Sequence, residues 1–377
     1  MRLFAENVYF CRKFQIMYLH EYENWWNFTF DTPKIMNRLA AVRAMQGRLI
    51  GELSSMGFSL QNEAQLTNIS IEIVKSSEIE GEMLNMEQVR SSVAQRLGIP
   101  TAGFVRTSRY VDGVVEMMLD ATHDYLKPLT DERLFGWHNV LFPNGMSGLY
   151  TIDVAKYRTH EMQVVSGPMG FETVHYQAVE PERVPMEMER FIKWFNEDDT
   201  CDRVLKAAIA HLWFVTIHPF DDGNGRIARA LTEMLLSRAD ETPRRFYSMS
   251  NQIQLDKNRY YDVLESVQRG EGDITEWLLW FLDCLEHSIK ATRETLSSVL
   301  RKAEFWETHS EMRFNERQKK LINMLFDGFF GKLNTSKWAK IAKCSSDTAL
   351  NDINDLIGKG VLKKNAEGGR STNYELM

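Results

Sequence analysis

The chain of 377 residues has the composition of a soluble globular protein, with 44% hydrophobic and 26% charged residues. Its length predicts two or three domains, and no apolar stretch approaches the ~18 uninterrupted residues of a membrane span. The net charge of −7 argues against nucleic-acid binding over the whole surface, although it leaves a local basic patch open.

The four cysteines, Cys11, Cys201, Cys284 and Cys344, are widely spaced along the chain. They form no Cys-x-x-Cys pair, so we expect neither a zinc site nor a disulfide framework. Residues 1–14 mix charged and apolar positions and make a poor signal peptide. We therefore expect reduced thiols, a cytoplasmic protein and no contact with a membrane.

Residues 1–61 are predicted to form an aromatic-rich helical domain. The stretch 18–31 is dense in Tyr, Trp and Phe, and we interpret it as a small structural core rather than a ligand site. Asp31 or Thr32 is predicted to cap a helix that has Pro33 in its first turn. The apolar residues of this helix keep helical spacing: Ile35, Leu39, Val42, Met45, Leu49 and Leu53.

Residues 62–96 are predicted to form two helices that join near Gly81, a glycine suited to the C-terminal end of a helix. Glu80 is unusual at this place, because a carboxylate there faces the negative end of the helix dipole. A cationic partner from elsewhere in the chain would offset this cost. Ser76 lies one turn before Glu80 on the same face.

The middle of the chain is predicted to hold scaffold helices and one hairpin. Two helices are expected within residues 101–145, the second capped by Thr130. Residues 162–165 and 172–176 are strand-like, and they flank a turn at 166–170. Further helices are expected at 185–196, 203–217, 258–264, 273–284 and 289–305, of which 203–217 is apolar almost all round and is predicted to be buried.

Residues 315–377 are predicted to form a winged helix, with helices at 316–326, 335–343 and 346–359 followed by a two-stranded wing. The third helix carries Asp347, Asp352 and Asp355, and acidic side chains fit a phosphate-lined DNA groove poorly. We therefore favour contact with protein, or a packing role, over contact with DNA. The basic residues of the wing keep DNA binding open: Lys363, Lys364 and Arg370.

Residues 218–229, with the sequence His-Pro-Phe-Asp-Asp-Gly-Asn-Gly-Arg-Ile-Ala-Arg, connect an apolar run to a helical pattern. Gly223 and Gly225 let the backbone approach a ligand closely and turn its N–H groups toward it. A helix that starts directly afterwards adds the positive end of its dipole. Arg226 and Arg229 supply donors that fit phosphate, so this loop predicts an anion-binding site.

Two side chains of the loop are suited to chemistry: Asp222 can hold a magnesium ion, and His218 can act as a base near neutral pH. The string matches the signature of Fic-domain proteins, His-x-Phe-x-Asp/Glu-Gly-Asn-Gly-Arg-x-x-Arg, at every specified position. The chain therefore resembles this family. The resemblance implies a mainly α-helical bundle over residues 62–300 with a β-hairpin flap, followed by a linker helix and winged helix over 301–377.

The resemblance also implies an activity, the transfer of AMP from ATP to Ser, Thr or Tyr hydroxyls of proteins, the enzyme itself included. His218 would deprotonate the hydroxyl, and Asp222 would hold Mg²⁺. The remaining contacts with ATP are implied for Gly223, Asn224, Gly225, Arg226 and Arg229, with the two arginines on the distal phosphates.

Residues 62–81 resemble the inhibitory helix of Fic proteins, Ser/Thr-x-x-x-Glu-Gly/Asn, with Ser76, Glu80 and Gly81 at the specified positions. The resemblance implies that Glu80 pairs with Arg229 and blocks the productive seating of ATP. The protein would then be autoinhibited.

The hairpin at about 162–176 resembles the flap of Fic proteins, where a target protein docks as an added strand. By the same similarity, Asn258, Tyr260 and Tyr261 border the adenine. The aromatic stretch 18–31 resembles a small N-terminal domain that precedes Fic domains in some bacterial proteins.

Other functions stay open. The same fold could remove AMP from a modified protein or transfer another phosphate-containing group, and a regulator could use the winged helix on DNA. A metal hydrolase built on His211, His218 and Asp222 has no His-Glu-x-x-His motif in its support. The sequence does not identify the target protein or the signal that relieves inhibition. It does not determine the oligomeric state either, and a homodimer stays open.

Overall fold

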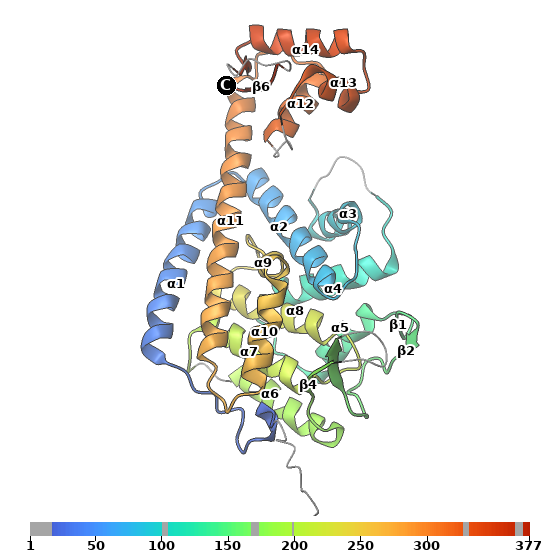
Figure 1. Ribbon diagram of the computed structural model, residues 1–377, viewed down its shortest axis with the longest axis vertical. Helices are drawn as coiled ribbons and strands as arrows, with labels where there is room; N and C mark the ends of the chain where they lie inside the picture. The colour runs from blue at the N-terminus through green and yellow to red at the C-terminus, as the bar shows by residue number, and fades with distance from the viewer. Residues whose placement is uncertain (1–16, 100–104, 167–172, 198–199, 327–331, 366–371) are drawn as a thin grey trace, which may run out of the picture. The chain divides into compact units, whose positions relative to one another are not determined.

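The computed structural model describes residues 17–99, 105–166, 173–197, 200–326, 332–365 and 372–377. The chain divides into two compact units, Met1–Lys290 and Ala291–Met377. Helices make up most of both units, and the strands of the described residues pair into small two-stranded sheets. The predicted mainly α-helical fold is therefore confirmed (Figure 1).

The helices of the first unit are α1 (Thr32–Ser54), α2 (Phe58–Ile79), α3 (Met86–Leu97), α4 (Arg109–His123), α5 (Asp131–Leu141), α6 (Val184–Glu197), α7 (Arg203–Ile217), α8 (Asn224–Asp240), α9 (Met249–Leu255) and α10 (Lys257–Gln268), with short 3₁₀ helices at Leu19–Glu21 and Pro181–Arg183. The strands are β1 (Met146–Ser147) with β2 (Tyr150–Thr151) and β3 (Gln163–Ser166) with β4 (Thr173–Gln177), both pairs antiparallel. The helix α9 and the β1–β2 hairpin were not predicted.

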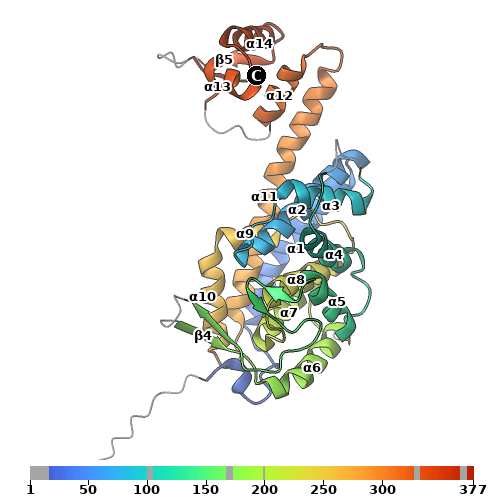
Figure 2. The same ribbon diagram turned by 90° about the vertical axis from the view of Figure 1, so that its right-hand side faces the viewer.

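The helices α7 and α8 pack against each other at the centre of the first unit, as both views show (Figures 1 and 2). Every residue of α7 from Val204 to Ile217 is buried, which confirms the predicted core helix. The helix α4 packs against α8, and α6 packs against α7. The turn between α7 and α8 is thus held by a rigid centre.

The N-terminal aromatic stretch packs on this centre rather than forming a core of its own. The rings of Trp25 and Phe28 meet Trp213 of α7 edge-on, with centroids 6.0 and 5.8 Å away. The predicted cap of α1 is confirmed, because the Asp31 side chain accepts a hydrogen bond from the Lys34 N–H at 3.2 Å. The helix α2 begins at Phe58, earlier than its predicted start at residue 62.

The prediction of separate helices at 273–284 and 289–305 was wrong. A single helix, α11 (Thr275–Thr308), covers both ranges. No Pro or Gly interrupts its sequence, and buried apolar residues such as Leu285 and Ile289 continue across the predicted gap.

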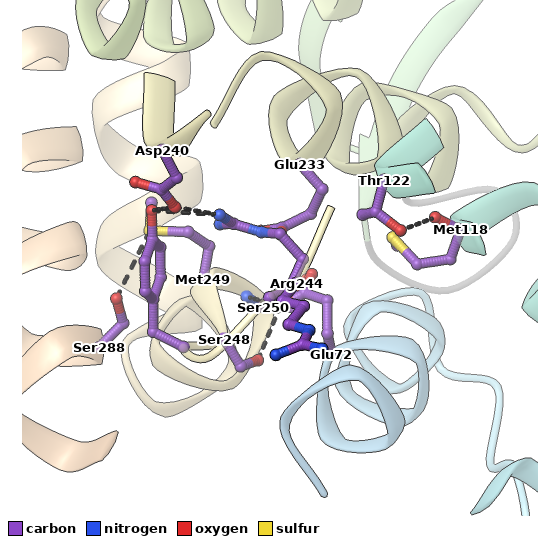
Figure 3. Close-up of polar contacts among 12 residues, drawn as sticks. Glu72, Met118, Thr122, Glu233, Asp240, Arg244, Ser248, Met249, Ser250 and Ser288 are labelled. Atoms are coloured by element: carbon purple, nitrogen blue, oxygen red, sulfur yellow. Dashed lines mark hydrogen bonds and ion pairs between the residues drawn. The ribbon is translucent and has the colours of Figure 1, made fainter. Parts of the chain in front are cut away.

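A buried polar cluster ties α2 to the segment that follows α8 (Figure 3). Glu72 of α2 accepts hydrogen bonds from the Ser248 hydroxyl at 2.7 Å and the Ser250 N–H at 2.9 Å, at the start of α9. Beside it, Arg245 pairs with Glu233 at 2.6 Å and with Asp240 at 2.5 Å. Since buried charges are costly unless paired, this cluster fixes the position of α2.

The second unit contains α12 (Glu316–Phe326), α13 (Thr335–Ala342), α14 (Ser346–Gly358) and an antiparallel hairpin of β5 (Leu362–Lys364) and β6 (Tyr374–Leu376). Their order matches the predicted helices and wing, and the residues 366–371 of the wing, Arg370 included, lie outside the described residues. Asp352 does not belong to an exposed acidic face, because it is buried against Arg317 with an ion pair of 2.7 Å. None of the described helices has the length and apolar character to cross a membrane.

Candidate active site

The loop between α7 and α8 is a tight turn closed by its own asparagine. His218 ends α7 in the left-handed conformation with φ 53°, and Gly223 precedes α8 with φ 81°. The Asn224 side chain accepts a hydrogen bond from the Phe220 N–H at 3.0 Å and donates one to the Phe220 carbonyl at 2.7 Å. These bonds leave the Asn224 side chain inside the turn, so a ligand would meet its backbone N–H instead.

The first turn of α8 is a ready position for an anion. The N–H groups that open a helix have no acceptor inside it, and they lie at the positive end of the dipole. A Cβ on Gly225 would lie 2.0 Å from Glu80 Oε1 and 3.2 Å from Arg229 Nη1, so the Glu80 side chain would have to shift if this residue were larger. The Arg229 guanidinium therefore lies beside the first turn of α8.

His218 is held as a neutral imidazole with one defined tautomer. Its Nδ1 lies 3.2 Å from the Val215 carbonyl, which can only accept, so Nδ1 carries the proton and Nε2 keeps a lone pair. Burial lowers the pKa of His218 to about 4, with Arg158 adding to the shift. Arg158 also donates through Nε to the His218 carbonyl at 2.7 Å. This arrangement leaves Nε2 unprotonated at neutral pH, as a general base requires.

A cavity of about 690 Å³ opens beside His218. Gly225 lies at one side, and residues from β3, β4 and α10 form the walls. The predicted adenine-side residues are brought here, since Asn258, Tyr260 and Tyr261 all line the cavity. Its volume lies in the range of small-ligand sites.

Arg229 is buried and is held by the end of α2. Its Nε donates to the Ser76 hydroxyl at 2.8 Å, and its Nη2 donates to the Ser76 carbonyl at 2.8 Å and to Glu80 Oε1 at 2.7 Å. Only 2% of the Arg229 side chain is exposed. The cationic partner expected for Glu80 is therefore Arg229. The third nitrogen, Nη1, is buried and lies next to the first turn of α8.

The end of α2 follows the predicted geometry. Gly81 has φ 84°, a left-handed conformation that a glycine adopts without strain. Lys257 at the start of α10 donates a hydrogen bond to the Ile79 carbonyl. This lysine lines the cavity, as Glu80 does, so the end of α2 lies at the ligand site.

Arg226 lies apart from Arg229 in a cage of its own. Its Nη1 donates to the Tyr110 hydroxyl at 2.7 Å and to Glu82 Oε2 at 3.0 Å, and its guanidinium lies 5.0 Å from the centre of the Phe142 ring. The side chain is 1% exposed. Neither Arg226 nor Arg229 lines the cavity, whereas Glu80 does.

Asp222 stands at the edge of the loop with 39% of its side chain exposed. The Ser147 hydroxyl of β1 donates to its Oδ2, and the Gly223 N–H donates to its Oδ1 at 2.5 Å. Arg226 Nη2 lies 3.5 Å from Oδ1. A single, partly exposed carboxylate of this kind fits a magnesium ion that takes its other ligands from water and phosphate oxygens.

The metal hydrolase interpretation is not supported. His211 Nδ1 lies 3.0 Å from the Thr232 hydroxyl, and its Nε2 lies 2.9 Å from the Tyr260 hydroxyl, so both ring nitrogens are engaged. Within the part of the chain that the structure describes, no three His, Cys, Asp or Glu residues gather as metal ligands.

The predicted flap is present as β3 and β4, which pair from Gln163↔Gln177 to Ser166↔Thr173 with an irregularity after Val164. His175 of β4 contacts Glu265 of α10, Nδ1 to Oε2, at 2.6 Å. The hairpin is therefore fastened next to the cavity. The predicted turn covered residues 166–170. Ser166 is the last residue of β3, and residues 167–172 lie outside the part of the chain that the structure describes.

Comparison with known proteins agrees with this geometry. Residues 128–236 match the model of the Fic/DOC family. The chain therefore contains a Fic domain. Residues 18–99, which include α2 and Glu80, match a domain of unknown function, DUF4172.

Solved and curated proteins resemble this Fic-domain protein to different extents. A Fic family protein from Desulfovibrio desulfuricans G20 shares the fold, with a TM-score of 0.54, 21% identity, and coverage of 92% of this chain and 97% of that one. A protein named "Protein adenylyltransferase Fic" from Drosophila yakuba is 36% identical over 111 residues, 29% of this chain and 21% of its own. A protein of the same name from Nematostella vectensis is 24% identical over 58% of this chain and 47% of its own. The match thus covers about a fifth of the length of the Drosophila protein and about half of the length of the Nematostella protein.

Several residues that shape the site were not identified from the sequence: Glu82, Tyr110, Ser147, Arg158 and Lys257. Most of them act on partners distant in sequence. Arg158, for example, donates to the His218 carbonyl, and its own N–H donates to the Pro219 carbonyl at 2.9 Å. Every residue has a backbone carbonyl, so a hydrogen bond to one requires no particular residue type and cannot be predicted from the sequence. Glu82 carried the one available signal, because it follows the inhibitory motif as a second carboxylate near a helix end.

Proposed function

We propose that the protein is an autoinhibited protein adenylyltransferase that transfers AMP from ATP to a Ser, Thr or Tyr hydroxyl. One observation carries the proposal: a neutral histidine with a free Nε2 borders a ligand-sized cavity at the first turn of α8, beside which the guanidinium of Arg229 lies. The relatives named adenylyltransferases add support, although their match covers part of their length.

In the proposed reaction, the target hydroxyl attacks the α-phosphorus of ATP while His218 Nε2 takes its proton. The new P–O bond forms as the bond to the β-phosphate oxygen breaks, and pyrophosphate leaves. The N–H groups at the start of α8 stabilise the charge on the phosphoryl oxygens. Asp222 would hold Mg²⁺, which would neutralise part of the phosphate charge.

The substrates occupy the two sides of the cavity in this proposal. The base of ATP lies toward Asn258 and Tyr261, and its distal phosphates lie toward Arg226 and Arg229. The target docks at the β3–β4 flap, where an added strand would bring its hydroxyl to His218. Glu80 inhibits the reaction because it holds Arg229 in place of the γ-phosphate.

The test is mass spectrometry of the protein after incubation with ATP and Mg²⁺, using the Glu80→Gly variant and the same variant with His218→Ala. We expect an AMP adduct in the first and none in the second. ATP binding by the His218→Ala variant should stay within about tenfold of its parent, since the base contributes little to phosphate affinity. If Glu80→Gly gains no adduct and modifies no protein in an extract, the proposal is wrong.

A second function is removal of AMP from a modified protein. The Glu80 carboxylate and His218 line the same cavity, and a carboxylate can orient an attacking water there. The wild-type chain incubated with an AMP-modified protein would then release AMP, and Glu80→Gly would release less. Loss of hydrolysis with gain of transfer in Glu80→Gly would assign both reactions to one site.

A further inference from the structure

The turn after α2 presents two carboxylates to α8. Glu80 is the last residue of the helix end, Gly81 is left-handed, and the Glu82 N–H donates to the Ser77 carbonyl at 3.0 Å. The Gly81 N–H donates to the Glu78 carbonyl, also at 3.0 Å. These two bonds form a Schellman motif, which fixes the backbone on both sides of Gly81. The side chains of Glu80 and Glu82 are therefore held at defined positions.

Each carboxylate meets a different arginine of the signature. Glu80 pairs with Arg229 at 2.7 Å, and Glu82 Oε2 pairs with Arg226 Nη1 at 3.0 Å. Both guanidiniums are almost fully buried, whereas 37% of the Glu82 side chain is exposed. Glu82 therefore covers Arg226 on its solvent side, as Glu80 covers Arg229 on the side of the cavity.

The Glu82 carboxylate is partly buried beside Arg226. Burial raises the pKa of its carboxyl above the ordinary value, and the nearby charges of Asp222 and Glu80 raise it further, against the opposing effect of Arg226. Removal of Glu82 would still leave Arg226 its bond to the Tyr110 hydroxyl and the nearby Asp222. The pair can thus open without leaving the guanidinium unpaired.

We propose that Glu82 is a second inhibitory carboxylate, which occupies the phosphate-binding face of Arg226 while Glu80 occupies that of Arg229. This inference rests on the proposed function of the site. A nucleotide with distal phosphates must displace both carboxylates to reach both arginines. AMP has no distal phosphate, so its binding does not compete with Glu82.

The experiment measures nucleotide binding by calorimetry, in a His218→Ala background that prevents turnover. The variants are Glu82→Gln, Glu80→Gly and their combination. Gln keeps an acceptor for Arg226 and removes only the charge. Glu87→Gln is the matched control, because Glu87 lies close in sequence and is exposed at the start of α3.

We expect Glu82→Gln to bind ATP about tenfold more tightly than the control, within the usual range of coupling between sites, and AMP equally. The combined variant should bind ATP more tightly than either single variant. ATP binding by Glu82→Gln equal to that of the Glu87→Gln control would overturn the inference. An equal gain for AMP would also overturn it, because it would indicate a general loosening of the turn.

The two proposals fail separately. With His218 restored, AMP transfer is measured for Glu80→Gly alone and together with Glu82→Gln. If the variants bind ATP more tightly but attach no AMP, the proposed activity is wrong and the role of Glu82 stands. If AMP is attached but Glu82→Gln has no effect on ATP binding, the activity stands and the role of Glu82 is wrong.

Discussion

At the scale of single residues, His218 combines a fixed tautomer with a lowered pKa. The Val215 carbonyl holds the proton on Nδ1, and burial keeps the ring neutral until the pH falls to about 4. A base works only when unprotonated, so the activity of Glu80→Gly should persist as the pH falls from 7 to 5 and be lost near pH 4. The pH dependence of kcat/KM reports this pKa in the free enzyme. A midpoint near the ordinary histidine value of ~6.5 would contradict the burial-based pKa.

Asp222 is the second residue whose role can be measured alone. Its carboxylate is partly exposed and receives a hydrogen bond from Ser147 of a separate hairpin. We expect Asp222→Ala, in the Glu80→Gly background, to need at least about tenfold more Mg²⁺ for half-maximal transfer, since it loses the only predicted protein ligand. Asp347→Ala, an exposed change on α14, is the control. An unchanged Mg²⁺ requirement would make Asp222 a structural residue of the turn.

At the scale of elements, inhibition depends on where α2 ends. Glu80 reaches Arg229 because Glu72 and the start of α9 fix the helix, and because Lys257 binds its last carbonyl. Displacement of a phosphate by ~1 Å can cost ~100-fold in rate, so an occupied Arg229 is a strong block.

The prediction for this contact concerns four variants under one ATP concentration. Glu80→Gly should raise AMP incorporation strongly, by about 100-fold at most. Glu80→Asp should raise it less, because a shorter carboxylate stays close to the arginine. Arg229→Ala should not activate, since it removes the phosphate donor along with the partner of Glu80. Glu80→Gly with His218→Ala should return to background. Incorporation by Glu80→Gly equal to wild type would leave Glu80 a helix-end residue without an inhibitory role.

Element boundaries were predictable where a local signal marks them. Asp31 and Thr130 cap their helices as expected, and Gly81 ends α2. The prediction of two separate helices within α11 was wrong because it used only the spacing of the apolar residues. The range contains no Pro or Gly, so the helix continues through it. The helix α9 was missed although Ser248 caps it, because its 7 residues are too few to show a helical apolar spacing.

At the scale of the whole molecule, the site combines a local motif with distant supports. The motif specified the turn, its glycines and its two arginines, and these lie together because they are neighbours in sequence. The pairing of Glu80 with Arg229 was predicted because two motifs were present, and the distance of 2.7 Å agrees with it. Arg158 and Tyr110 could not be predicted, because their contacts depend on how α4 and the segment before β3 pack against the turn.

The same burial that tunes the site makes stability depend on pH. Burial lowers the pKa of His20, His138 and His218 to about 4 and of His211 to about 3, below the ordinary value of 6.5. In the unfolded chain, each of these histidines takes up a proton as the pH falls through ~6.5. In the folded protein, the same histidines stay neutral over this range.

We therefore predict that the free energy of unfolding of the first unit decreases as the pH falls from 6.5 to 5. The unfolded chain binds up to about four more protons than the folded chain, one for each of these histidines, and each contributes a slope of up to ~1.4 kcal/mol per pH unit. Denaturant titrations at several pH values measure this slope. His211→Gln removes one of the buried titrating groups and should make the slope shallower by about one proton, whatever its effect on stability at pH 7. His287→Gln, an exposed change on α11, is the matched control. A free energy of unfolding that stays constant between pH 6.5 and 5 would mean that these histidines are protonated in the folded state, and His218 would then need another group to keep it a base.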